Sequence, residues 1–168
     1  DCGIKSADKV AYASEKGIDF IICDHHLPDE DIPKAVAVLD PKQTDCPYPY
    51  KELSGCGVGF KLLQAFCIQN GIDQEEVYKL LDLLVVSIAS DIVPITGENR
   101  ILAYFGLRNL NGPQPMRPGL DALKELAGIT GEMDITSIVF GFAPRINAAG
   151  RMGDAKNSVR MLLAQTKE

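Results

Sequence analysis

A short apolar segment that ends in three polar side chains constrains the fold of this chain most strongly. Residues 18–23 are rich in β-branched and aromatic side chains, which predicts a buried strand. A helix is expected before it over 5–16, with Ser6 able to cap its start and Gly17 to end it. A second strand is expected over 35–39. This order predicts an α/β fold, with a parallel sheet of βαβ units and right-handed crossovers.

The rest of the chain is expected to be mostly helical, from about residue 57 onward. Asp73 and Glu76 have the spacing of a capping box before a helix that extends to residue 90. That helix carries apolar side chains at helical spacing, which predicts a central position: Val77, Leu80, Leu81, Leu84, Val85 and Ile88. Further helices are expected over 57–70, 98–110, 120–127, 134–141 and from Asp154 to the C-terminus, with loops over 41–57 and 111–119.

Composition excludes several classes of protein. Hydrophobic residues make up 46% of the chain and charged residues 24%, which is typical of a globular protein and not of a disordered one. There is no apolar run long enough to span a membrane. The five cysteines are an odd number without a C-x-x-C pair, which favours a reducing, cytoplasmic setting over a disulfide framework or a zinc ribbon.

The net charge of −6 conceals an uneven distribution of charge. Residues 141–168 hold five basic and two acidic side chains, so the C-terminal end is basic while the remainder is acidic. The segment contains Arg145, Asn147 and Arg151 among small residues. Arginine binds phosphate through two parallel hydrogen bonds, so we interpret this segment as a phosphate site. A solvated turn before the last helix is the alternative.

The histidines indicate a metal site. The chain has only two, and they are adjacent in Asp24-His25-His26, directly after the strand over 18–23. Ligands gather at the carboxyl ends of parallel strands, where Asp1 is expected to end the neighbouring strand. Asp91 ends the most apolar helix, where a charge is costly unless it is paired or bound to metal. Asp1, His25 and Asp91 together form an oxygen and nitrogen donor set suited to Mn²⁺ or Mg²⁺. A polar turn is the alternative for the triplet alone.

Two further features of the sequence have two interpretations each. Residues 54–59 are glycine-rich and open a helix, so they could offer backbone N–H groups to an anion, although tight helix packing explains them equally well. The chain begins Asp1-Cys2-Gly3 without methionine, like the end of a strand. We interpret it as a fragment of a longer protein, with a processed N-terminus as the alternative.

Five segments in this order resemble the DHH phosphoesterase family, and within it the RecJ-like exonucleases. They are Asp1-Cys2-Gly3, the name-giving Asp24-His25-His26, residues 53–61, residues 90–94 followed by Glu98-Asn99-Arg100, and residues 144–151. The resemblance covers essentially the whole chain. The family's first cluster of aspartates would precede Asp1, and its second domain would follow the chain. The resemblance therefore implies a partial DHH domain over 1–153 and the start of a connecting helix over 154–168.

The resemblance also implies a role for each candidate residue. Two Mn²⁺ or Mg²⁺ ions would activate water for attack on a phosphodiester, and one of the two metal sites would be incomplete here. Asp1 would bridge the ions, His25 and Asp91 would bind one of them, and Asp24 would orient an imidazole. The scissile phosphate would meet His26. The phosphates of the strand would be held by Arg145, Asn147 and Arg151.

The activity implied is a 5′-to-3′ exonuclease that hydrolyses single-stranded DNA in recombination and repair. Its expected partners are the 5′ end of the strand and a single-strand-binding protein, its setting is the cytoplasm, and no membrane is involved. We expect these 168 residues alone to be nearly inactive, because ligands are missing. The alternatives are a DHH phosphodiesterase acting on short oligonucleotides, cyclic dinucleotides or pyrophosphate, and a metal-binding or DNA-binding fragment without activity.

Overall fold

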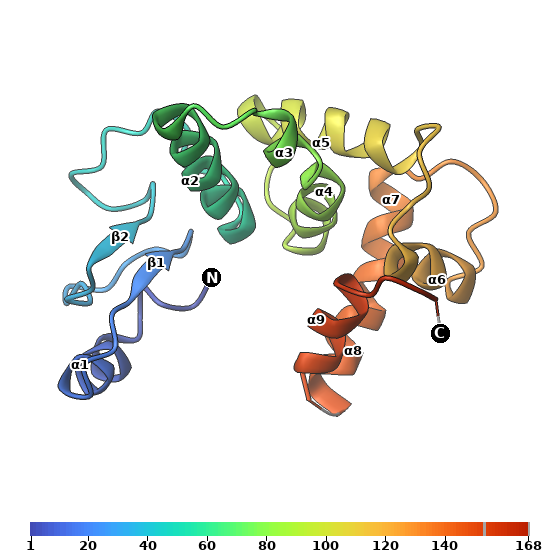
Figure 1. Cartoon of the computed structure of the whole chain (residues 1–168). Coiled ribbons are helices and arrows are strands. Elements are labelled where there is room, and N and C mark those ends of the chain that lie inside the picture. The colour runs from blue at the N-terminus through green and yellow to red at the C-terminus, as the bar shows by residue number, and fades with distance from the viewer. Residues whose placement is uncertain (153, 168) are drawn as a thin grey trace. The chain divides into compact units, whose positions relative to one another are not determined.

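The computed structural model describes residues 1–152 and 154–167, which form two compact units. The first unit contains Asp1–Tyr78 and Val93–Ile101. The second contains Lys79–Ile92 and the chain from Leu102 onward. Figure 1 shows the order of the helices and strands along the chain. Each unit therefore consists of two separate stretches of sequence.

The first unit holds the parallel strand pair that the sequence predicts. Cys23 lies opposite Leu39 in this pair, and the backbone N–H of Asp24 donates to the Leu39 carbonyl. The strands are shorter than predicted, and Ile22 is deeply buried while Ile21 is exposed. Two paired strands cannot cover both of their own faces, which explains the exposure. The elements are α1 (Ala7–Glu15), β1 (Ile21–Cys23), β2 (Ala37–Leu39), α2 (Gly55–Asn70), α3 (Glu75–Tyr78) and the first turn of α5 (Gly97–Leu110).

The ends of α1 match the prediction only in part. Gly17 adopts a left-handed conformation, with φ of 71°, and ends the helix as expected. Ser6 occupies the position before the helix, but its hydroxyl donates to the Cys2 carbonyl at 2.8 Å and caps nothing. The predicted cap was therefore wrong. The hydrogen bond instead ties the N-terminal residues to the start of α1.

Helix α2 begins earlier than predicted and includes the glycine-rich segment in its first turns. The Ser54 hydroxyl accepts a hydrogen bond from the Gly57 N–H at 3.1 Å, which caps the helix. Gly71 ends it with φ of 65°. Val58, Phe60 and Cys67 are buried. Cys23, on β1, is only half-buried. Residues 55–59 therefore form the first turns of α2.

The helix predicted after Asp73 is broken into two pieces. Asp73 Oδ1 accepts from the Glu75 N–H at 3.0 Å, so Asp73 does begin a helix, but that helix is the four-residue α3. The second piece, α4 (Leu81–Ser90), belongs to the other unit. Val77 is buried in the first unit, whereas the apolar face of α4 is buried in the second. The side chains of one continuous apolar pattern are therefore divided between two hydrophobic cores.

The second unit contains helices joined by loops, and no strand is present in the part that the structure describes. Its elements are α4, the rest of α5, α6 (Pro118–Leu126), α7 (Ile135–Ser137), a π-helical turn η1 (Ile138–Phe142), α8 (Ala143–Met152) and α9 (Lys156–Leu162). Its most deeply buried side chains include Leu84, Val85, Ile88, Leu120, Ile138 and Phe142. None of the helices described in either unit is long and apolar enough to cross a membrane.

The C-terminal third differs from the expectation in two details. The segment from residue 144 is helical, continuing from α7 and η1, so the alternative of a solvated turn does not hold. A π-helical turn shifts the hydrogen-bond register just before Pro144, which lets the helix continue despite the missing N–H of proline. The last helix ends at Leu162, and Asp154 Oδ1 accepts from the Lys156 N–H next to its start. Gly153 and Glu168, which end the expected ranges 1–153 and 154–168, lie outside the described residues.

Candidate metal centre

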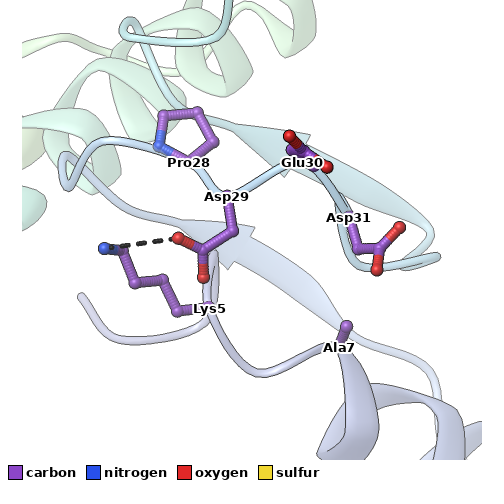
Figure 2. Close-up of a pocket in the computed structure, with 6 residues that line it drawn as sticks. All are labelled: Lys5, Ala7, Pro28, Asp29, Glu30 and Asp31. Carbon is purple, nitrogen blue, oxygen red and sulfur yellow. Dashed lines mark ion pairs between the residues drawn. The ribbon is translucent and has the colours of Figure 1, made fainter.

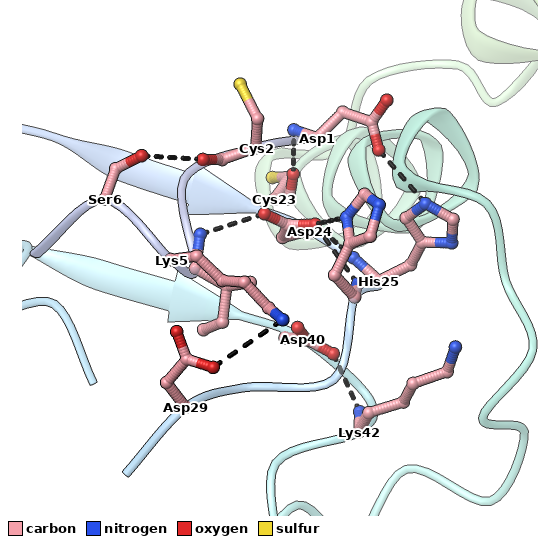
Figure 3. A network of polar contacts seen from close by, with 12 residues as sticks. Asp1, Cys2, Lys5, Ser6, Cys23, Asp24, His25, Asp29, Asp40 and Lys42 are labelled. Carbon is pink, nitrogen blue, oxygen red and sulfur yellow. Dashed lines mark hydrogen bonds and ion pairs between the residues drawn. The ribbon is translucent and has the colours of Figure 1, made fainter. Parts of the chain in front are cut away.

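Asp24 organises the polar cluster at the carboxyl end of β1 (Figure 3). Its side chain is fully buried, and Oδ2 accepts from the Ile4 N–H at 2.9 Å. Oδ1 accepts from the His25 N–H at 2.8 Å and the His26 N–H at 3.2 Å, and it lies 2.8 Å from His26 Nδ1. Burial alone would raise the pKa of Asp24, but these hydrogen bonds outweigh it and hold the pKa well below its usual range. Asp24 is therefore an ionised carboxylate that fixes the His26 ring.

Asp1 and the two histidines come together beside Asp24. Asp1 Oδ1 lies 3.2 Å from His25 Nε2, and the Asp1 ammonium donates to the Cys23 carbonyl at 2.7 Å. The His25 ring is buried and packs edge-on against His26, with ring centroids 4.5 Å apart. One donor atom from each of Asp1, His25 and His26 lies within 4.8 Å of the other two. The chain therefore gathers three of its predicted site residues around one point.

The donor set of this cluster fits a divalent metal ion. One carboxylate oxygen and two imidazole nitrogens converge at the spacing that shared coordination requires. Both Mn²⁺ and Mg²⁺ bind carboxylate oxygens, but Mn²⁺ is a transition metal and accepts imidazole nitrogen more readily than Mg²⁺, so a mixed set favours Mn²⁺. His26 Nδ1 is held by Asp24, which leaves Nε2 as the nitrogen available to a metal ion or a phosphate.

Asp91 lies in the second unit, directly after α4. The sequence led us to expect a carboxylate at a buried helix end, but the Asp91 side chain is exposed, so the energetic argument from burial was wrong. The next residue, Ile92, has φ of 55°, a left-handed conformation that β-branched residues rarely adopt. The metal-binding role of Asp91 stays a prediction.

The three residues of the predicted phosphate site have different surroundings on α8. Arg145 is half-buried and donates to two backbone carbonyls, that of Gly141 at 2.8 Å and that of Leu126 at 3.4 Å. Asn147 and Arg151 are exposed and four residues apart, so they lie one turn apart on the same helix face. Arg145 thus holds the chain around η1, while Asn147 and Arg151 face solvent. Their binding of phosphate stays a prediction.

Sequence reasoning missed a second buried carboxylate. Asp40 follows β2 as Asp24 follows β1, and it is 2% exposed. Its Oδ1 accepts from the Lys42 N–H at 2.8 Å, whereas its Oδ2 has no hydrogen-bond partner among the residues described. Burial raises the pKa of Asp40, and the nearby charge of Asp24 adds to this rise. The sequence feature that could have identified Asp40 is its position directly after a predicted strand.

Sequence reasoning also left Asn99 without a physical role. Asn99 is fully buried, and its Nδ2 donates to the carbonyls of Glu52 at 2.5 Å and Pro94 at 3.0 Å. Nearby, the Tyr50 hydroxyl donates to the Thr96 carbonyl at 2.7 Å. These contacts fasten the loop before α2 to the segment that opens α5. The sequence signal was the motif around Glu98 alone, which carried no indication of this contact.

A pocket of about 540 Å³ lies beside the N-terminal segment (Figure 2). Its lining includes Lys5 and three acidic side chains, and Lys5 Nζ lies 3.6 Å from Asp29 Oδ1. The carboxylates of Asp29, Glu30 and Asp31 make this pocket unfavourable for a phosphate group. The candidate site is therefore the cluster around Asp24 and not this hollow.

Comparison with known proteins identifies the family. A family model described as the DHH family, N-terminal domain, matches residues 1–88, more than half of the chain. The chain belongs to the DHH family. Among curated DHH-family relatives, it is 39% identical over 166 residues to the single-stranded-DNA-specific exonuclease RecJ of Bacillus subtilis. It is 40% identical over 173 residues to the RecJ of Haemophilus influenzae. These matches cover 98% of this chain but only 20% and 30% of the two relatives.

Solved structures agree with this assignment to the DHH family. A crystal structure of exonuclease RecJ bound to manganese matches with a TM-score of 0.84 and 34% identity, over 99% of this chain and 41% of that one. RecJ from Thermus thermophilus in complex with Mg²⁺ matches with a TM-score of 0.72 and 33% identity, over 90% of this chain and 22% of that one. The α/β fold predicted from the sequence is confirmed.

The low pKa of Asp24 predicts how stability depends on pH. A carboxylate whose pKa is lowered on folding contributes stability above its unfolded pKa, near 3.9, and loses it as the pH falls toward the folded value. We expect Asp24→Asn to lower the free energy of unfolding by about 2 kcal/mol at neutral pH and to flatten the acid dependence below about pH 4. Urea unfolding across pH without metal measures both. The exposed Asp29→Asn is the control, and an equal effect there would contradict the assignment.

Proposed function

We propose that this chain is the metal-binding part of an exonuclease that hydrolyses phosphodiesters of single-stranded DNA from the 5′ end, in recombination and repair. The convergence of Asp1, His25 and His26 beside a buried, ionised Asp24 carries the proposal. The names of the similar proteins support the substrate, since they are single-stranded-DNA-specific exonucleases. The titles of the similar structures, which name manganese and Mg²⁺, support the metals.

The residues of the cluster have different proposed roles in binding metal and phosphate. Bound Mn²⁺ or Mg²⁺, two ions in the complete enzyme, would activate water and stabilise the charge that develops on the phosphate. Asp1 and His25 would hold metal, because the Asp1 carboxylate and the buried ring nitrogen already face each other at 3.2 Å. Asp24 keeps a proton on His26 Nδ1, which leaves the half-exposed ring free to meet the scissile phosphate through Nε2.

We propose Asp91 as a further metal ligand on the strength of the sequence motif. The left-handed backbone at Ile92 supports a functional reason for the turn after α4, since strained residues concentrate at functional sites.

The proposed partners are the 5′ end of a DNA strand and a single-strand-binding protein. The proposed compartment is the cytoplasm, which the five free cysteines support.

Phosphate binding along the strand is proposed for Arg145, Asn147 and Arg151. We expect Arg151→Ala to weaken binding of a single-stranded oligonucleotide and to lower the slope of log affinity against log salt by about 1, with stability unchanged. Arg145→Ala should lower the melting temperature as well, because the Gly141 carbonyl loses its donor. Fluorescence anisotropy across salt concentrations and thermal unfolding measure the two effects. Arg108→Ala, an exposed arginine on α5, is the control, and a slope unchanged by Arg151→Ala would remove that residue from the phosphate path.

Metal and strand binding by the chain itself test the proposed function. Calorimetric titration should show Mn²⁺ binding more tightly than Mg²⁺ to the metal-free protein. The Mn²⁺-loaded chain should prefer a 5′-phosphorylated single strand over a duplex of the same sequence. We expect little release of nucleotides, because the cluster offers fewer ligands than two ions require. Mn²⁺ affinity unchanged by Asp1→Ala, or equal affinity for duplex, would contradict the proposal.

A further inference from the structure

Gly55 lies where any side chain would collide with Asp1. A Cβ built on Gly55 would come within 2.3 Å of Asp1 Oδ1, 2.8 Å of its Cγ and 2.9 Å of its Cβ. Gly55 is the first residue of α2 and follows the capping Ser54. The Asp1 carboxylate therefore rests against the first turn of the helix, in space that only glycine leaves open.

The backbone conformation does not by itself require glycine at this position. Gly55 is not among the glycines with positive φ, which include Gly17 and Gly71 in the part of the chain described. Two other glycines of the same helix differ from Gly55. An added Cβ would meet nothing within 4 Å at Gly59, and at Gly57 its nearest atom would lie at 3.4 Å. Alanine is also a better helix former than glycine. The contact with Asp1 is therefore the physical reason for glycine at 55.

The start of α2 also supplies a favourable electrostatic environment for a carboxylate. The N-terminal end of a helix carries partial positive charge, and α2 is 16 residues long. The Asp1 side chain is otherwise mostly exposed, at 63%, and its other contact in the cluster is His25 Nε2. A helix end on one side and an imidazole on the other define where this flexible carboxylate lies.

We propose that Gly55 is a positioning residue of the metal centre. By leaving room for the Asp1 carboxylate against the start of α2, it holds that carboxylate next to His25 at the spacing that metal binding needs. The glycine-rich segment thus accommodates an anionic group, which is the carboxylate of Asp1 in the same chain. This inference rests on the proposed function, because it assigns Asp1 to a bound metal ion.

The substitution Gly55→Ala tests the proposal against the matched Gly59→Ala on the same helix. The Asp1 side chain is mostly exposed to solvent, so we expect it to swing aside without unfolding the protein. The melting temperature of Gly55→Ala should stay at or above that of the wild type, while Mn²⁺ affinity falls about tenfold, as for other supports of metal ligands. Gly59→Ala should keep wild-type Mn²⁺ affinity. Calorimetry and thermal unfolding provide both measurements.

A second readout needs no metal. The chain has only two histidines, so ¹⁵N-labelled histidine gives signals from two rings only, which Asp1→Ala and Asp24→Asn assign. Gly55→Ala should shift the His25 signal as Asp1→Ala does and leave His26 in place. Wild-type signals and Mn²⁺ affinity in Gly55→Ala would overturn the inference. A wild type that fails to bind Mn²⁺ would count against the proposed function, and the histidine signals would still decide the role of Gly55.

The double variant with Asp1→Ala covers the case in which Gly55→Ala is unstable. If the collision with Asp1 is the reason, removing Asp1 should restore stability, and Gly55→Ala should change neither Mn²⁺ affinity nor the His25 signal further. A double variant that stays unfolded would show that glycine is needed for the helix start itself, and this would overturn the proposal.

Discussion

Replacing His25 with alanine is expected to lower Mn²⁺ affinity by about 100-fold or more, because the variant loses a metal ligand outright. The ring is 7% exposed, and its Nε2 lies 3.2 Å from the Asp1 carboxylate. Calorimetric titration of Mn²⁺ measures the loss. Binding of a single-stranded oligonucleotide without metal should change little.

The contrast with His26 makes this prediction specific. His26 is half-exposed and is held by Asp24, so His26→Ala should affect Mn²⁺ binding much less than His25→Ala. The volume-matched His25→Gln controls for the cavity that alanine leaves in a buried position. If His26→Ala removes Mn²⁺ binding as strongly, both rings are ligands and the proposed phosphate role of His26 is wrong.

Replacing Asn99 with alanine is expected to destabilise the first unit by about 3 kcal/mol. The variant loses both hydrogen bonds from Nδ2, so the carbonyls of Glu52 and Pro94 lose this donor, and a fully buried side chain is truncated. Urea unfolding followed by the fluorescence of tyrosine is a suitable measurement, because Tyr50 lies at the same junction.

An exposed asparagine provides the control for this substitution. Asn70, at the end of α2, donates to the Phe66 carbonyl within its own helix and is exposed to solvent. Asn70→Ala should therefore cost well under 1 kcal/mol. If Asn99→Ala costs as little as Asn70→Ala, water replaces the Asn99 hydrogen bonds, and the loop before α2 is not fastened there.

The core of the candidate site could be predicted because it depends on local pattern. A strand that ends in Asp24-His25-His26 places those side chains at the edge where parallel strands end. The structure contains the predicted strand pair and brings Asp1 next to both histidines. The buried contacts of Asn99 and Asp40 could not be predicted in the same way. Each depends on which loop folds back onto which element, and periodicity carries no information about that.

Helix continuity and arginine contacts show a second limit of the sequence. The apolar positions from Val77 to Ile88 fit one helix, but the pattern does not say whether these side chains are buried in one core or in two.

Arg145 was predicted to hold phosphate, yet its guanidinium donates to the Gly141 and Leu126 carbonyls. A guanidinium has five donors, and the sequence does not allocate them between backbone and ligand.

The division of the chain into units has a consequence for engineering. The family match ends at residue 88, inside α4, whereas the first unit is completed only by Val93–Ile101, which brings Asn99 back to the loop before α2. A gene trimmed at the family boundary would encode Asp24 and His25 without the segment that fastens that loop. Chimeras between relatives should therefore exchange 1–78 and 93–101 as one linked pair, while 79–92 can come from either parent together with the chain after 102.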